Sequence, residues 1–578
     1  MFVEEASWGE LFSAVADVCI VGAGPAGIAA AVSLGRSGWR VLLIESGSEH
    51  THAAQALGEL AGVDPKRHAA MDVATRRGWG GTSALWGGRC VPLDPVDFEA
   101  RPQRGNARWP FGYEQLAGFY ERATDFSRCG KARFTVDEAL GPNRPPIAEG
   151  FKDGEVLAST LERWSLPTRF GDEYRDEIAG SVHIRVVQGL TCVELDTDDG
   201  GQAVGAAVLK SLDGRIFRAQ ARQFVIAAGG LESTRLLFNS NRVHRAGLGN
   251  HADQLGRYYM GHASGKLAKI EFTGKASRTI FGFERDADGI YCRRRFTISA
   301  EQQRSAGLMN GSFWLDNPAI ADARHRNGIL SLAYLALTMP ILSRYLAPEG
   351  VRAAAVAGLA SSRFAHLWNV VTSLPATIAF AVPFVWQRYM AKRKVPGFFL
   401  SSKSNAYALH YHCEQAPNPD SRVTVSEQRD ALGMRKIKVD LRFADADFRS
   451  IIGLHEILDA ELRRQGVGRL HYLEGSLEAH ADRQASDGFH QIGTTRMSER
   501  PEDGVVDGDC RVHFTDNLYV ASSSVFPTSG QANPTLTIIA LSLRLADHLS
   551  ARLSDRGTEP VVTPTVLPDE TTVAGLAA

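Results

Sequence analysis

A chain of 578 residues is too long to fold around one hydrophobic core, so two or more domains are expected. Its hydrophobic and charged fractions are those of a globular protein, and a formal net charge of -1 argues against a nucleic-acid partner. The seven cysteines form no CxxC or CxxCH motif. We therefore predict no metal site, no haem attachment and no disulfide framework.

The N-terminal segment MFVEEASWGELF is acidic and lacks the basic flank and the apolar core of a signal peptide. Together with the scattered cysteines, this predicts a cytoplasmic protein in a reducing compartment.

The stretch from Val18 to Glu45 predicts a strand, a tight turn, a helix and a second strand, with Gly22, Gly24 and Gly27 in the spacing GxGxxG. The first glycine permits the turn, the second lets the backbone approach a pyrophosphate, and the third lets helix and strand pack closely. The amides at the helix N-terminus then face the phosphates. Glu45, at the end of the second strand, is placed to accept hydrogen bonds from ribose hydroxyls. The stretch therefore predicts a dinucleotide-binding unit.

A glycine-rich loop, RRGWGGTSALWGG, follows from Arg76 to Gly88. Its backbone can lie flat against a planar ligand, and Thr82 and Ser83 offer hydroxyls and amides to phosphate or ring oxygens. A plain surface loop is the alternative, although a stretch that has two tryptophans and no charge from 78 to 88 is an unusual choice for solvent. From Trp109 to Phe126 the pattern predicts an amphipathic helix.

From Val182 to Gly230 the residues alternate as in strands, and the last strand runs into the glycine turn of AAGGLESTRLL. A second strand-to-glycine turn of this kind usually closes over the adenine side of the same dinucleotide. It suggests one sheet assembled from pieces that are separated in the chain.

The segment 329–400 differs from its surroundings, because it carries seven Lys or Arg residues and a single acid. Its run 367–386 consists of twenty uncharged residues, and as a helix this length covers about 30 Å. Pro375 and Pro383 interrupt the run, and the apolar run before it, 329–342, is too short to span a bilayer.

Three arrangements of this insert remain open. A pair of helices lying in a membrane interface, with the basic residues at anionic headgroups, allows the chain to leave and return on the same face. A hairpin that crosses the membrane is the second, and a buried helical cap or an oligomer contact is the third. The first arrangement would place the protein at the inner face of the membrane.

After the insert, the residues 408–443 predict strands separated by the turns NPDS and DALG, and the residues 444–465 predict a helix. Two motifs close to the C-terminus follow. The first is DGFHQIGTTRM, 487–497, and the second is the strand, small-residue loop and long helix of 517–549. Pro534 is predicted at the first helical position, where its missing N–H would be unpaired anyway. The proline-punctuated tail 556–578 is predicted to be disordered.

The glycine motif, GGTSALWGG, AAGGLESTRLL and the C-terminal motifs together resemble the glucose-methanol-choline (GMC) oxidoreductases, flavoproteins that oxidise alcohols with FAD. The chain is most similar to the branch of pyranose oxidase and the sugar 3-oxidases, over about residues 15 to 550 apart from the insert. In some members of that branch, a histidine just before the tryptophan of the glycine loop bonds covalently to the flavin. Leu85 holds that place here, which implies that FAD is bound without a covalent link.

The resemblance implies an α/β fold: a Rossmann-type FAD domain and a substrate domain with an antiparallel sheet. We predict the FAD domain at 1–114, 181–262 and 505–555, and the substrate domain at 115–180, 263–328 and 401–504. It also implies a set of cofactor-binding residues, namely Gly22, Gly24, Gly27, Glu45, Gly81, Thr82, Ser83, Trp86, Cys192, Ala228, Gly229, Ala521, Ser522, Pro534 and Thr535.

Two residues are predicted to be catalytic, His490 and Asn533. They match the family's paired active-site positions, the first always His and the second His or Asn. A neutral imidazole suits removal of a hydroxyl proton near neutral pH, and the amide of Asn533 can hold the substrate oxygen. The hydride would pass to flavin N5, and the N-terminus of the helix after Pro534 would stabilise the negative charge on the reduced ring.

We expect the substrate to be a sugar or a glycoside with a secondary alcohol, and the apolar insert suggests that this substrate is linked to a lipid. The expected electron acceptor is oxygen, a quinone or another carrier. One rival interpretation is a membrane-surface dehydrogenase of a lipid or sterol alcohol. The other is a flavin-binding scaffold that no longer turns over, and the intact pair His490 and Asn533 speaks against it.

Overall fold

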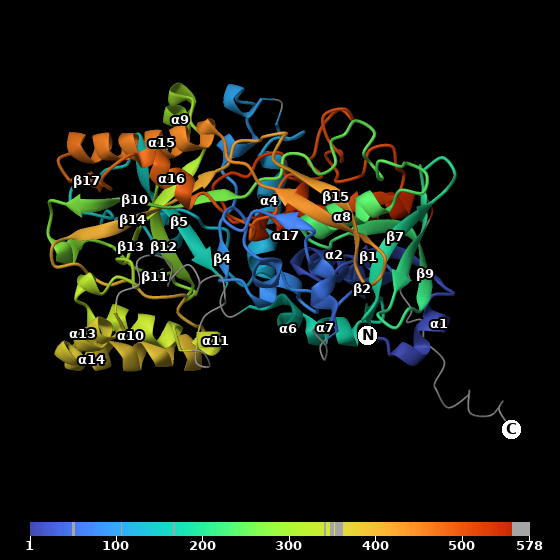
Figure 1. The fold of residues 1–578 in the computed structure, drawn as a ribbon, viewed down its shortest axis with the longest axis horizontal. Helices are drawn as coiled ribbons and strands as arrows, with labels where there is room; N and C mark the ends of the chain where they lie inside the picture. The colour runs from blue at the N-terminus through green and yellow to red at the C-terminus, as the bar shows by residue number, and fades with distance from the viewer. Residues whose placement is uncertain are drawn as a thin grey trace.

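The computed structural model describes residues 1–48, 53–105, 107–165, 168–339, 343–346, 352, 362–555 and 557. The predicted disordered tail, 556–578, lies outside the described residues apart from Gly557. Figure 1 shows two halves side by side, one built on a mixed α/β sheet and one on a large antiparallel sheet. This is the α/β class with an antiparallel second sheet that was predicted.

The first half contains a seven-stranded sheet in the order β6-β2-β1-β9-β8-β7, with β18 paired to β9. Strands β6, β2, β1, β9 and β18 run parallel, whereas β7, β8 and β9 form an antiparallel meander. The bounds are β1 Val15–Val21, β2 Val41–Glu45, β6 Ile184–Gln188, β7 Thr191–Thr197, β8 Val204–Lys210, β9 Ile216–Ile226 and β18 Leu518–Val520.

Helices cover this sheet because its central strands are apolar on both faces. All five residues of β2 are buried, and so are the last five of β1. Helix α17 (Thr535–Asp555) packs against both α2 (Pro25–Arg36) and α4 (Glu114–Phe126). The predicted strand, helix and strand of the glycine motif are therefore confirmed as β1, α2 and β2. The core of this half also includes α4, which we had assigned to the substrate domain.

The second half is an eight-stranded sheet in the order β17-β10-β14-β13-β12-β5-β4, with β11 paired to β12. Helix α15 (Asp445–Arg464) lies on one face of this sheet (Figure 1), and it packs against β5, β12, β14 and β17. The strands are β4 Arg89–Cys90, β5 Val156–Trp164, β10 His262–Phe272, β11 Glu284–Arg285, β12 Tyr291–Ile298, β13 Gly311–Asp316, β14 Ala406–Glu414 and β17 Gly468–Tyr472.

Strands β15 (Arg422–Arg429) and β16 (Arg435–Asp440) lie elsewhere than expected. They do not join the large sheet but form a three-stranded sheet with β3 (Gly62–Val63), and they pack on α8 (Gly230–Asn239) of the first half. Alternation predicts that such segments are strands, but it carries no information about which sheet they join.

Short helices connect these elements. They are α1 Trp8–Leu11, α3 Met71–Ala74, α5 Val136–Leu140, α6 Phe170–Glu173, α7 Arg175–Gly180, α9 Ala300–Ala306 and α16 Leu477–Gln484.

The insert forms helices on the side of the large sheet opposite α15 (Figure 1). They are α10 (Gly328–Leu337), α11 (Ser343–Leu346), α13 (Arg363–Thr372) and α14 (Leu374–Val385), and a π-helical turn (Trp386–Met390) extends α14. Among the described residues no single helix is long and apolar enough to cross a membrane. By length and composition α13 and the segment 374–390 pass that test together, but they are bent by 93°.

Asp447, in the first turn of α15, should make the stability of the fold depend on pH. Burial raises the pKa of its carboxyl to about 7, although the amides of Ala416 (2.6 Å) and Ala444 (2.7 Å) donate to it. The folded chain therefore holds a proton that the unfolded chain loses at about pH 4. The free energy of unfolding should fall by up to about 1.4 kcal/mol per pH unit as the pH rises from about 4 to about 7.

Urea unfolding at several pH values in this window measures that slope for the wild type and for Asp447→Asn. The variant should show a shallower slope, whatever its absolute stability. Identical slopes would show that Asp447 does not titrate in this range.

Candidate active site

Three loops meet at one edge of the parallel sheet. In the strand register Val21 of β1 lies beside Ile226 of β9, which in turn lies beside Val520 of β18. The predicted cofactor residues Gly22, Gly24, Ala228, Gly229, Ala521 and Ser522 directly follow these strand ends. Because ligands of open α/β sheets bind beyond the carboxyl ends of the strands, this is the expected place for a dinucleotide.

The glycine turn has the shape that a pyrophosphate requires. A Cβ on Gly22, whose φ is +107°, would lie 2.5 Å from the Ala227 carbonyl oxygen, and one on Gly27 would lie 1.9 Å from the Gly22 oxygen. A Cβ on Gly24 would meet no atom within 4 Å. Gly22 and Gly27 thus allow close packing, whereas Gly24 leaves open the approach to the N-terminus of α2.

The glycine-rich loop lies directly against this turn. The amide of Gly80 donates to the Ala23 carbonyl at 3.0 Å, and a Cβ on Gly81 would lie 2.9 Å from Cα of Gly24. The hydroxyl of Ser83 donates to the Gly80 carbonyl at 2.5 Å, and that of Thr82 accepts from the Arg76 amide. In this structure the two hydroxyls hold the loop, and a direct contact with the cofactor stays a prediction.

Glu45 ends β2 and is buried. Its two oxygens accept from the amides of Ala23 (2.8 Å) and Gly47 (2.9 Å), and burial raises its pKa while these amides lower it. Each carboxylate oxygen has a second lone pair, so acceptance from ribose hydroxyls is still possible. Cys192 is buried in β7 after the end of β6, where burial raises the pKa of its thiol.

Two further predicted cofactor positions have other contacts in the structure. The indole of Trp86 donates to the Thr168 carbonyl at 2.9 Å. Helix α17 begins at Thr535, one residue later than predicted, and the Pro534 carbonyl accepts from the Ile538 amide. Pro534 therefore lies just before the helix, which leaves the free amides of the first turn at Thr535 and beyond.

The two predicted catalytic side chains are in contact, although 43 positions separate them in the chain. Nδ2 of Asn533 lies 2.9 Å from Nε2 of His490. The loop of His490 is held on both sides, because Gln491 accepts from the Leu231 amide and the Gly493 amide donates to Ser523. Oδ1 of Asn533 is buried and has no hydrogen-bond partner among the described residues.

Asp487 orients the imidazole of His490 and was missed by the sequence analysis. Its Oδ2 lies 2.9 Å from Nδ1 of His490 and accepts from the His262 amide at 2.7 Å. Burial alone would raise the pKa of Asp487, but His490 and His262 lower it well below its usual range. Its position three residues before His490, in DGFH, is the signal that could have identified it.

Because a carboxylate only accepts, we assign the proton of His490 to Nδ1. Nε2 then carries a free lone pair, to which the amide of Asn533 donates. This tautomer is the one that a general base requires.

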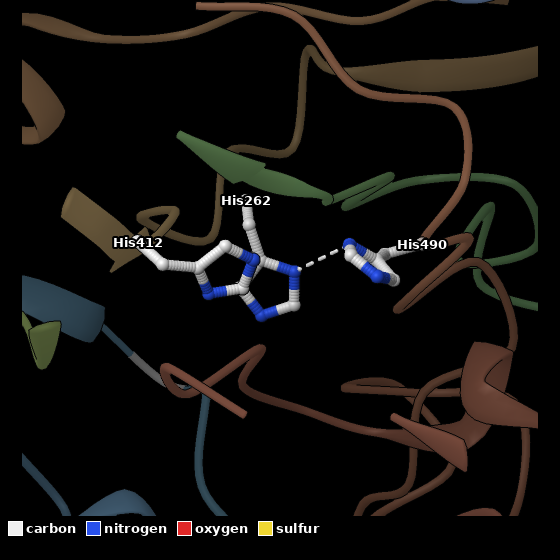
Figure 2. A group of neighbouring side chains, drawn as sticks. All are labelled: His262, His412 and His490. Atoms are coloured by element: carbon white, nitrogen blue, oxygen red, sulfur yellow. Dashed lines mark hydrogen bonds between the residues drawn. The ribbon is translucent and has the colours of Figure 1, made fainter. Parts of the chain in front are cut away.

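Two more imidazoles complete the site (Figure 2). Nδ1 of His262 lies 3.0 Å from Nδ1 of His490, and the ring of His412 stacks on that of His262 with centroids 4.3 Å apart. Burial is the largest cause that lowers the pKa of both His262 and His412 well below the usual value. Both rings therefore stay neutral beside His490.

Nitrogen atoms of His262, His412 and His490 lie within 4.8 Å of one another, a set that could hold a metal ion. No metal ligand was predicted from the sequence. Nδ1 of His490 faces His262 at 3.0 Å and Asp487 at 2.9 Å, and the contact with Asp487 places a proton on that atom, so its lone pair is not available to a metal. The hydrogen bonds therefore favour a hydrogen-bond network among these side chains over a metal site.

The residues at the sheet edge fit FAD. The open approach above Gly24, the N-terminus of α2 and the carboxylate of Glu45 match its pyrophosphate and ribose, and the unpartnered Oδ1 of Asn533 marks the substrate side. Fold and site together define an FAD-dependent oxidoreductase.

Comparisons with known proteins agree with this class. A family model described as GMC oxidoreductase matches residues 417–542, and one described as FAD dependent oxidoreductase matches residues 17–49. The chain is 25% identical to paromamine 6'-oxidase of Streptomyces fradiae, over 94% of this chain and 93% of that protein. It is 22% identical to 2-methyl-1,2-propanediol dehydrogenase of Mycolicibacterium austroafricanum, over 93% and 96% of the two chains.

The solved structure of a fungal aryl-alcohol oxidase has the same fold, with a TM-score of 0.52 at 13% identity over 94% of this chain and 100% of that chain. These matches support the resemblance to the GMC oxidoreductases, and the chain is an enzyme that uses FAD to oxidise CH–OH donors.

Proposed function

We propose that this enzyme oxidises a CH–OH group of a sugar or glycoside to a carbonyl, with His490 as the base. The observation that carries the proposal is the pair formed by Nε2 of His490 and the amide of Asn533, 2.9 Å apart, with Asp487 behind the imidazole. The name of paromamine 6'-oxidase, which is similar over most of the chain, supports a glycoside-like alcohol, and that of the propanediol dehydrogenase supports a polar alcohol without indicating its size.

The substrate hydroxyl would take the place of the bond between His490 and Asn533. Its O–H then donates to Nε2 of His490, and its oxygen accepts from Nδ2 of Asn533. As the C–O bond gains double-bond character, the proton moves to Nε2 and Asp487 stabilises the imidazolium. When bound, FAD supplies the acceptor for the hydride that leaves the carbon.

Anaerobic mixing of the purified yellow protein with sugars, glycosides and lipid alcohols tests the proposal. A sugar or glycoside should bleach the visible absorption of the flavin and yield one equivalent of the carbonyl product. If none of them does so while another alcohol class does, the proposed substrate class is wrong.

A lipid or sterol alcohol is the second candidate, and a row of contacting side chains from the insert to the active site favours it. Consecutive neighbours in this row are adjacent in sequence or have ring and guanidinium centres 4.5 to 6.3 Å apart. The row consists of Phe384, Phe398, Phe399, Phe283, Trp164, Arg293, Trp314 and His412. Flavin bleaching by lipid alcohols, with soluble sugars inert, would select this candidate.

Asp487→Asn should lower kcat by roughly 10- to 100-fold with FAD still bound, since an amide cannot accept from every donor around Asp487.

Because the native pKa of Asp487 lies below that of an unfolded aspartate, Asp487 stabilises the fold above about pH 4, and this contribution disappears as the pH falls through the native value. Stopped-flow reduction and acid unfolding measure the two effects. Wild-type reduction by the variant would show that Asp487 does not orient His490.

A further inference from the structure

The insert helices are packed with their apolar sides outward. Large apolar side chains on α13, α14 and the π-helical turn are exposed, among them Phe364 at 83%, Trp368 at 68%, Val382 at 65% and Trp386 at 63%. We define the apolar face as Phe364, Leu367, Trp368, Val371, Leu374, Ile378, Val382, Val385, Trp386 and Met390. On α13 the members Phe364, Leu367, Trp368 and Val371 recur at the spacing of one helix side, so they form a stripe along that helix.

The opposite side of the same helices is polar and buried. Asn369 donates to the Ala323 carbonyl at 2.8 Å and to Ser331 of α10 at 3.1 Å, and Ser331 lies 3.0 Å from Nδ1 of His366. Thr377 is the one buried residue of α14, and its hydroxyl donates to the Ser373 carbonyl at 2.9 Å.

The packing between the insert helices is close. A Cβ on Gly328 of α10 would lie 2.1 Å from Oγ of Ser373 and 2.4 Å from Oγ1 of Thr377. Turning α13 over would bury its apolar side chains but would take Asn369 and His366 away from Ala323 and Ser331. These hydrogen bonds hold the apolar side of α13 outward, and the close fit of Thr377 against Gly328 does the same for α14.

The charges beside the face point to the nature of its partner. Lys392 and Lys394 follow the π-helical turn that extends α14, and the described part of the insert contains no acidic residue. The guanidinium of Arg388 instead donates to the Val395 carbonyl, and that of Arg393 to the Arg128 carbonyl. In an isologous dimer the face of one copy meets the same face of the other, which brings like charges together. Anionic lipid headgroups, by contrast, neutralise them.

The aromatic residues and the bend agree with a bilayer surface. Trp368 and Trp386, whose rings suit the boundary between headgroups and acyl chains, lie on the apolar face. The angle of 93° between α13 and the segment 374–390 is unlike a straight span. An apolar side with tryptophans, bordered by Lys and Arg, is the pattern of helices that lie in an interface.

We propose that the apolar face lies in the interfacial layer of a lipid bilayer, with the basic residues after α14 against anionic headgroups. The enzyme then works as a peripheral membrane protein, with the insert as its docking element. Of the three arrangements left open by the sequence, this corresponds to the first.

Flotation of the holoenzyme with lipid vesicles tests this proposal. The protein should float with vesicles of phosphatidylcholine and phosphatidylglycerol and float less with phosphatidylcholine alone. Trp368→Asp and Val382→Asp, at exposed positions, should abolish flotation while the protein stays folded and yellow. Ile216→Asp is the matched control, because Ile216 is 60% exposed on β9, outside the insert, and that variant should float like the wild type.

Replacing Lys392 and Lys394 by glutamine separates the charge contribution from the apolar one. Each lysine charge should raise the affinity for anionic vesicles about fivefold. The double variant should therefore bind anionic vesicles roughly 25-fold more weakly than the wild type, and its affinity for neutral vesicles should be unchanged. Brominated lipids should quench the wild type more strongly than Trp386→Phe.

Two results would overturn the proposal. One is a wild-type protein that does not float with anionic vesicles. If the Trp368→Asp variant also has a lower molar mass than the wild type in light scattering, the apolar face is a contact between protein chains. The other is Trp368→Asp and Val382→Asp variants that still float. Reduction of the flavin by a soluble alcohol is measured separately, so failure to dock is distinguishable from failure of the proposed catalysis.

Discussion

His490→Ala should lower kcat by roughly 10²- to 10⁴-fold, the contribution typical of a positioned general base. Without the imidazole, nothing takes the substrate proton at the place where Asn533 now donates to Nε2, 2.9 Å away. The visible spectrum of bound FAD should remain, because the glycine turns of the cofactor site are untouched. Anaerobic stopped-flow reduction measures the effect on the reductive step alone.

Two further variants make this result specific. His490→Gln keeps a hydrogen-bonding side chain beside Asp487 but no base, so it should be about as slow as the alanine variant. His471→Ala removes an exposed imidazole whose partner is Glu271, and it should reduce flavin at the wild-type rate. A His490→Ala enzyme with near-normal turnover and bound FAD would disprove the assigned base.

Gly24→Val should yield a folded protein whose affinity for FAD is roughly 10- to 100-fold lower than that of the wild type. The backbone of Gly24 is extended, with φ -79° and ψ -174°, so valine fits without strain, and its Cβ meets no protein atom within 4 Å. The side chain instead occupies the approach to the N-terminus of α2, where the pyrophosphate is expected. Titration of the apoprotein with FAD, followed by fluorescence, measures the affinity.

Two other glycines provide the comparison. Gly118→Val, on α4, also meets no atom within 4 Å and should bind FAD normally. Gly27→Ala, whose Cβ would lie 1.9 Å from the Gly22 oxygen, should damage the fold itself and not only FAD binding. Normal affinity in Gly24→Val would show that the phosphates bind elsewhere.

Local sequence was sufficient for much of the fold and the site. The glycine spacing identified β1, α2 and β2, because such a turn is specified by a few neighbouring residues. His490 and Asn533 were found through motifs, and the structure brings them within 2.9 Å. Long-range pairing was less predictable, as the separate sheet of β15 and β16 shows, since alternation marks a strand but not its partner.

The sequence by itself determined the dinucleotide turn and the apolar, basic character of the insert, because each is encoded in adjacent or regularly spaced residues. The pairing of His490 with Asn533, 43 positions apart, was predicted through the family resemblance. Only the tertiary structure decided that His262 and His412 join His490, since these residues come from different strands and a loop. It also decided which way the insert faces. Periodicity groups the apolar residues on one side of a helix, but the hydrogen bonds of Asn369 to the Ala323 carbonyl and to Ser331 of α10 turn that side of α13 outward.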